Sequence, residues 1–176
     1  MFQQQDLNFI HKYFIGEKQE SLLFLIVGII AILLSVVFFF FIKTTLSFFK
    51  GAAIPLLAIG FIQAVVGYTV YARSDKQRLD VAYKTGLEPA SFIKNEELPR
   101  MKTVNKNFVI YRWVEISLIV TGIVLIFLFK GNTGRIFWYG LGVTLAVQSA
   151  LMLGADYFAE RRAHVYTKVM EMLIQK

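Results

Sequence analysis

The chain has 176 residues, of which 56% are hydrophobic and only 18% are charged. Soluble domains have fewer apolar and more charged residues, so this composition indicates a membrane protein and excludes disordered, collagen-like and disulfide-stabilised chains. The sequence contains no cysteine, which excludes thiolate metal sites and cysteine nucleophiles, and in a membrane protein the net charge of +7 reports orientation.

The N-terminal segment, residues 1–20, carries apolar side chains at helical spacing. Leu7, Ile10 and Phe14 recur every three or four residues. This pattern predicts a short helix that lies on the membrane surface.

Four later segments are long and apolar enough to be transmembrane helices. About 20 helical residues cross a hydrocarbon core of roughly 30 Å. A helix is favoured because it satisfies its own backbone polar groups, and the alternation of a β-barrel strand is absent. The predicted spans are residues 21–42, 51–72, 108–129 and 136–158. The sequence therefore predicts an all-α, four-helix transmembrane bundle that forms a single membrane domain over residues 1–176.

The segments between the spans differ in length and in charge. Residues 43–50 and 130–135 form tight hairpin loops, whereas the central segment is long. Lys and Arg number 15 in residues 1–20, 73–112 and 159–176, against 4 in the two short loops. Positive residues stay on the cytoplasmic side. We therefore expect a multi-pass protein of the bacterial inner membrane, with both termini and the central segment in the cytoplasm.

The cytoplasmic segments are themselves expected to be helical. Pro89 is suited to open a helix that runs to Leu98 and stops at Pro99. The second and fourth spans are predicted to continue beyond the membrane as helical extensions, because an apolar stripe follows the fourth span. That stripe comprises Val165, Tyr166, Val169, Met170 and Leu173.

The two halves of the chain resemble one another. The segment from Glu20 to Gly28 is similar to the segment from Glu115 to Gly122, and each opens a hairpin. Two hairpins of like orientation would form a tandem repeat about an axis along the membrane normal.

Ionisable residues recur at one level, near the cytoplasmic end of every span. Charges inside a bilayer are costly, so these residues need partners or a function. One interpretation is a gate, vestibule or proton site, and the other is a structural ring in which Arg73 or Arg112 pairs with Glu115 and Asp156. The candidates are Glu20, Arg73, Arg112, Glu115 and Asp156.

Two glutamines lie deeper, near the middle of the second and fourth spans. Gln63 and Gln148 are each about 12 residues from the outer boundary. They either line a polar path or substrate site, or they form one interhelical amide hydrogen bond.

Rows of small residues favour close packing of the second and fourth spans. Small side chains allow helix backbones to approach, either within the chain or in a homo-oligomer. The row in the second span is Gly60, Ala64 and Gly67, and that in the fourth is Gly142, Ala146, Ala150 and Gly154.

No motif of an enzyme, a metal site or a cofactor site is recognisable. His11 and His164 are the only histidines, and neither has a ligand-spaced companion. The basic central segment is explained by orientation and anionic headgroups, so nucleic acid is not an expected partner. We expect a non-enzymatic protein with no catalytic residue, no metal and no cofactor.

The segment from Glu97 to Glu115, ELPRMKTVNKNFVIYRWVE, resembles a segment of small four-span inner-membrane proteins of Bacteroidota type. The resemblance implies no catalytic residues. Proteins of this size and topology include immunity proteins against membrane-acting toxins, which is our leading hypothesis, with the toxin or a membrane complex as protein partner. The alternative is a pore-forming or transport subunit, including a membrane effector of a phage-defence system.

Overall fold

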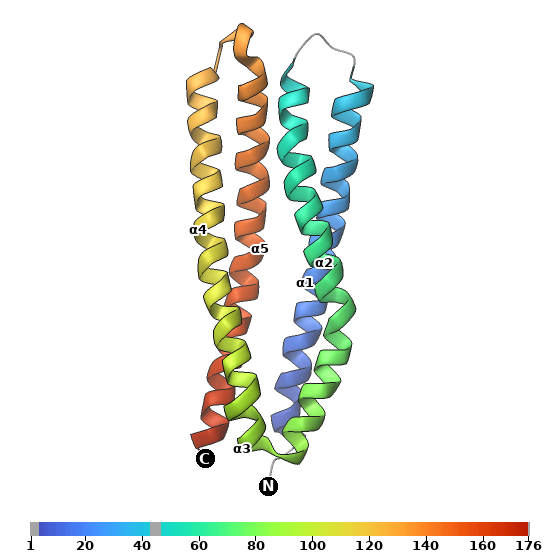
Figure 1. The fold of residues 1–176 in the computed structure, drawn as a ribbon, viewed down its shortest axis with the longest axis vertical. Coiled ribbons are helices and arrows are strands. Elements are labelled where there is room, and N and C mark those ends of the chain that lie inside the picture. The colour runs from blue at the N-terminus through green and yellow to red at the C-terminus, as the bar shows by residue number, and fades with distance from the viewer. Residues whose placement is uncertain (1–3, 43–46, 176) are drawn as a thin grey trace.

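The computed structural model describes residues 4–42 and 47–175, with side chains from residue 8 onward. Four long helical segments run side by side (Figure 1). The first is α1 (Gln4–Val36) with η1 (Val37–Phe41), and the second is α2 (Phe48–Leu87). The third joins α3 (Pro89–Phe92), η2 (Ile93–Glu97) and α4 (Leu98–Phe129). A short turn, η3 (Thr133–Arg135), leads into α5 (Ile136–Gln175).

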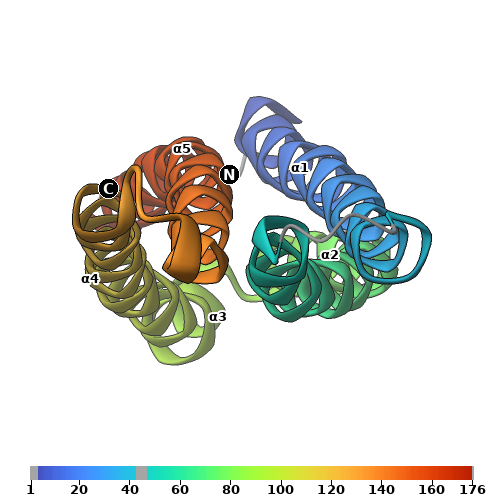
Figure 2. The same cartoon turned by 90° about the horizontal axis from the view of Figure 1, so that it is seen from above.

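The helices form two hairpins, α1 with α2 and α4 with α5. Seen end-on, the two hairpins lie beside one another, and α2 and α5 make the main contact between them (Figure 2). The described ends of the chain, at Gln4 and Gln175, lie at one end of the bundle, and η1 and η3 lie at the other (Figure 1). The all-α prediction is confirmed, and four helices are long and apolar enough to cross a membrane.

Each helix is longer than a membrane crossing requires. A helix of 40 residues, such as α2 or α5, is about 60 Å long, twice the thickness of a hydrocarbon core. The less apolar parts of α2 and α5 lie at the end that holds the termini, and both helices continue there without a break, as the sequence predicted.

The prediction of a surface helix at the N-terminus is wrong. Residues Ile10, Tyr13 and Phe14 belong to α1, and all three side chains are buried in the bundle. The side chain of Leu7 lies outside the described residues. The apolar stripe is covered because the extensions of α4 and α5 provide an apolar surface for it.

The helix that Pro89 opens does not stop at Pro99. It runs without interruption from Pro89 to Phe129, because η2 is a π-helical turn in which the Leu98 amide bonds to the Ile93 carbonyl, five residues back. A proline ring clashes with the carbonyl four residues earlier in an α-helix. The wider turn relieves that clash, so the chain passes Pro99 as a helix.

The terminal half of the bundle has a core like that of a soluble four-helix bundle. All four long helical segments contribute buried side chains to this core. In the opposite half of the bundle, the apolar side chains point outward and are exposed. The core comprises Ile10, Tyr13, Phe14, Val81, Phe92, Ile93, Met101, Ala163, Tyr166 and Met170.

Within each hairpin the two helices meet at glycines. A Cβ added to Gly28 of α1 would lie 2.6 Å from the Ala64 nitrogen and 2.7 Å from the Gly60 oxygen of α2. Gly67 meets α1 in the same way, at the Ser21 oxygen and the Leu25 nitrogen. The small row of α2 therefore packs against α1, its hairpin partner, and not against α5 as the sequence suggested.

The second hairpin repeats this arrangement. A Cβ on Gly122 of α4 would lie 2.7 Å from the Ala146 nitrogen and 2.8 Å from the Gly142 oxygen of α5. Ala150 and Gly154 are exposed, and a Cβ on Gly154 would meet nothing within 4 Å. Only the first half of the small row in α5 is thus used for close packing, because α4 faces α5 with larger side chains further along.

The hairpins approach each other most closely at the end away from the termini. A Cβ on Gly51 of α2 would collide with the Phe137 oxygen of α5, and one on Gly140 of α5 would collide with the Phe48 oxygen. Backbone contact at these two glycines holds α2 against α5.

Candidate functional site

The two mid-depth glutamines bond to each other. The Gln148 amide nitrogen of α5 donates to the Gln63 side-chain oxygen of α2 at 2.6 Å. Both side chains are buried, with 1% and 3% of their surface exposed. This bond joins the two hairpins in the apolar half of the bundle. Of the two interpretations that the sequence allowed, a polar path or an interhelical amide hydrogen bond, it corresponds to the second.

Two acidic residues of the second hairpin, Glu115 and Asp156, are neighbours. Glu115 of α4 is 2% exposed, and Asp156 of α5 is its ionisable neighbour across the helix pair. Neither Glu115 carboxylate oxygen has a hydrogen-bond partner among the described residues. Ionised carboxylates only accept hydrogen bonds, so the two cannot bond without a shared proton or an intervening cation. Glu115 is therefore a buried acid that needs either a proton shared with Asp156 or a cation beside the pair.

Glu115 and Asp156 line a pocket of about 450 Å³ between α4 and α5. The walls are apolar and aromatic, with Phe108, Leu153 and Tyr157 among them, and Ala150 and Gly154 leave the space open because their side chains are small. Arg112 and Glu160 lie at the same pocket. This combination of buried acid, apolar wall and open volume is the candidate functional site.

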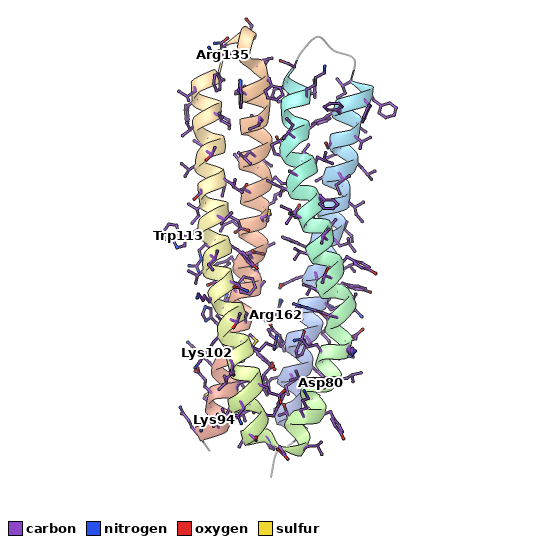
Figure 3. The ribbon with its side chains drawn as sticks, in the orientation of Figure 1. Asp80, Lys94, Lys102, Trp113, Arg135 and Arg162 are labelled. Carbon is purple, nitrogen blue, oxygen red and sulfur yellow. The ribbon has the colours of Figure 1, made fainter. Side chains whose placement is uncertain are left out.

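The basic residues of the predicted ring do not pair with these acids. Arg112 forms an ion pair with Glu160, which also contacts His164 at 3.4 Å. Glu20 pairs with Arg162, and Figure 3 shows Arg162 between the hairpins. Arg73 is exposed and forms no ion pair with any other described residue. The expected pairing of Arg73 or Arg112 with Glu115 and Asp156 is therefore wrong, because Glu160, one turn beyond Asp156, engages Arg112.

A second, smaller pocket of about 260 Å³ lies on the other side of α5. It is lined by Leu23, Phe24 and Val27 of α1, by Gln63 of α2 and by Ala155 of α5, with Glu20 at its edge. Glu20 and Gln63 thus face one pocket, whereas Glu115 and Asp156 face another. The polar side chains that the sequence singled out are thus divided between two pockets.

A buried ionic network, which sequence reasoning missed, joins three helices in the terminal half. Arg100 donates two hydrogen bonds to Glu97, at 2.6 and 2.8 Å, and the Tyr166 hydroxyl of α5 donates to Glu97 at 2.8 Å. The Tyr166 ring stacks on Tyr13 of α1 at 4.2 Å. Burial raises the pKa of Tyr166, which keeps its hydroxyl protonated as the donor. The spacing of Glu97 and Arg100, three residues apart in a helix, was the available signal.

Glu17, just before the first apolar span, makes the stability of the fold depend on pH. Burial raises the pKa of its carboxyl above the ordinary value, although Arg73 and Arg100 oppose the shift, and Ser74 donates to it at 3.3 Å. A carboxyl whose pKa is raised by folding favours the fold when it is protonated and loses that contribution as the pH rises through the folded-state pKa.

We expect Glu17→Gln to stabilise the protein at pH 7 to 8, because the neutral amide removes the cost of a buried charge. The gain should shrink as the pH falls toward the ordinary carboxyl range, where Glu17 is itself neutral. Thermal unfolding in detergent between about pH 4 and pH 8 measures it. Glu88→Gln, at an exposed position, is the control, and a gain that persists unchanged at low pH contradicts the assignment.

Comparison with protein-family models, with curated proteins and with solved structures finds no match to this chain.

Proposed function

We propose that the chain is a non-enzymatic protein of the bacterial inner membrane that acts by binding, in the specific form of an immunity protein that sequesters a membrane-acting toxin. The observation that supports binding over conduction is the Gln63–Gln148 hydrogen bond. A polar path through a membrane needs polar side chains that face it. The two deepest polar side chains are engaged with each other, and Glu20 lines a different pocket from Glu115 and Asp156.

The surface for a toxin lies on the side of the bundle where α1 and α5 meet. The α2–α5 seam is closed near Gly51 and Gly140 by backbone contacts. The groove between α1 and α5 retains about 260 Å³ of space with apolar walls. An apolar toxin helix packs into such a groove by van der Waals contact.

The proposal is tested by protection and by co-purification. Cells that express the chain should survive a membrane-acting toxin encoded beside it, and the toxin should co-purify with the solubilised chain. Ala155→Trp fills the α1–α5 groove and should abolish both protection and co-purification. Leu151→Ala widens the same groove and is the matched control, which should leave the fold intact. Protection that survives Ala155→Trp would place the toxin elsewhere.

A pore-forming or transport subunit, including a membrane effector of a phage-defence system, is the alternative, and one observation favours it: the buried acid pair Glu115 and Asp156 at an open pocket. A transport subunit should conduct or transport in proteoliposomes, and Gln148→Leu should change the flux. An immunity protein should be silent in the same assay with and without that substitution.

The orientation proposed from the charge asymmetry is testable with single cysteines, because the chain has none. Lys94 and Arg135 lie at opposite ends of the bundle (Figure 3). We expect a membrane-impermeant maleimide to label Arg135→Cys on intact cells and to label Lys94→Cys only after the membrane is opened. The reverse pattern would place the termini outside the cytoplasm.

A further inference from the structure

The pocket between α4 and α5 contains more negative than positive groups. Its ionisable residues are Arg112, Glu115, Asp156 and Glu160. Arg112 and His164 both contact Glu160, so the charge of Glu160 is compensated within the protein. Glu115 and Asp156 are left without a basic partner among the described residues.

An uncompensated acid in an apolar setting requires a positive partner or a proton. Burying a carboxylate without a positive partner is costly, and Glu115 is 2% exposed with Asp156, another acid, as its ionisable neighbour. The open volume beside it is large enough for a bound molecule, since ligand pockets range from about 300 to 1,000 Å³, and this pocket has about 450 Å³.

The lining selects the chemical class of that molecule. A metal ion needs several polar ligands, and among the described residues no group of three His, Cys, Asp or Glu side chains is placed to hold one. The walls are instead apolar and aromatic, and the rings of Phe108 and Tyr157 can also attract a cation through their faces.

We propose that this pocket binds a hydrophobic organic monocation, whose positive centre is neutralised by Glu115 and Asp156 and whose apolar body packs against Phe108, Leu153 and Tyr157. This inference goes beyond the proposed immunity function, since it needs no protein partner. The bound cation would supply the positive partner that Glu115 and Asp156 do not find among the described residues.

Tetraphenylphosphonium is a suitable probe, and binding to the full chain in detergent is measured by isothermal titration calorimetry. We expect one saturable site in the wild type and at least tenfold weaker binding in Glu115→Gln, which keeps the shape of the side chain and removes its charge. Glu171→Gln, on the exposed face of the tail of α5, should bind as the wild type does. The neutral analogue triphenylphosphine oxide should bind at least tenfold more weakly than the cation.

A second pair of variants tests the space without touching the charge. A Cβ meets nothing within 4 Å at Gly154 or at Gly86, but only Gly154 lines the pocket. Gly154→Leu should therefore abolish binding, and Gly86→Leu should not. The proposal is overturned if the wild type shows no saturable binding, if Glu115→Gln and Gly154→Leu bind like the wild type while remaining monodisperse, or if the neutral analogue binds equally well.

Discussion

Glu97→Ala is expected to destabilise the bundle by about 3–5 kcal/mol, the range found when one partner of a buried ion pair is removed. Glu97 is 2% exposed and accepts both Arg100 hydrogen bonds and that of Tyr166. Its removal leaves a partly buried guanidinium and a buried hydroxyl without a partner. Thermal or denaturant unfolding in detergent, followed by circular dichroism, measures the loss.

The adjacent residue provides a matched control. Glu96 also forms an ion pair, with Lys84 at 3.1 Å, but both side chains are well exposed, at 60% and 41%. Exposed pairs contribute about 0–1 kcal/mol, so Glu96→Ala should change stability little. Glu97→Gln should fall between the two, because the amide can still accept from Tyr166. Equal losses for Glu96→Ala and Glu97→Ala would contradict the buried network.

Gly122→Ala and Gly154→Ala are expected to act in opposite directions. At Gly122 the new methyl group would lie 2.7 to 2.9 Å from backbone and side-chain atoms of Ala146 and Gly142, so α4 and α5 must move apart. Overpacking of this kind costs about 1–3 kcal/mol. At Gly154 the methyl group meets nothing, and the helix gains up to about 1 kcal/mol in propensity.

The two variants share one chemical change and differ only in what the new methyl group meets. Unfolding of the purified protein in the same detergent compares them directly. If both stabilise the protein, the close approach of α4 to α5 at Gly122 is not a feature of the fold. Gly28→Ala should behave like Gly122→Ala, since Gly28 occupies the corresponding crossing in the first hairpin.

The equivalence of the two crossings bears on the proposed tandem repeat. In each hairpin the first helix presents one glycine to a glycine and an alanine four residues apart on the second helix. The matching glycines, Gly28 and Gly122, are the ones that end the similar sequence segments. A common origin of the hairpins remains a prediction, but in both hairpins the two helices pack through the same arrangement of a glycine against a glycine and an alanine.

The sequence by itself determined the elements. Helix number, the two short hairpin connections and the extensions of α2 and α5 follow from apolar length and helical periodicity, which are local properties of the chain. The hydrogen bond between Gln63 and Gln148 could also be predicted from the sequence, because two amides at one depth in an apolar bundle have few other partners. The continuation of the helix through Pro99 could not be predicted, since a π-helical turn depends on how the flanking helices pack.

Only the tertiary structure decided which groups face each other. Asp156 and Glu160 are four residues apart, so they lie on one face of α5 and about 6 Å apart along its axis. The axial register of α4 against α5 therefore decides which of the two meets Arg112, and the sequence, which does not define that register, paired Arg112 with the wrong acids. Packing at Gly122 and Gly142 sets the register. As a result, Glu160 forms the ion pair with Arg112, and Glu115 and Asp156 lie together at an open pocket.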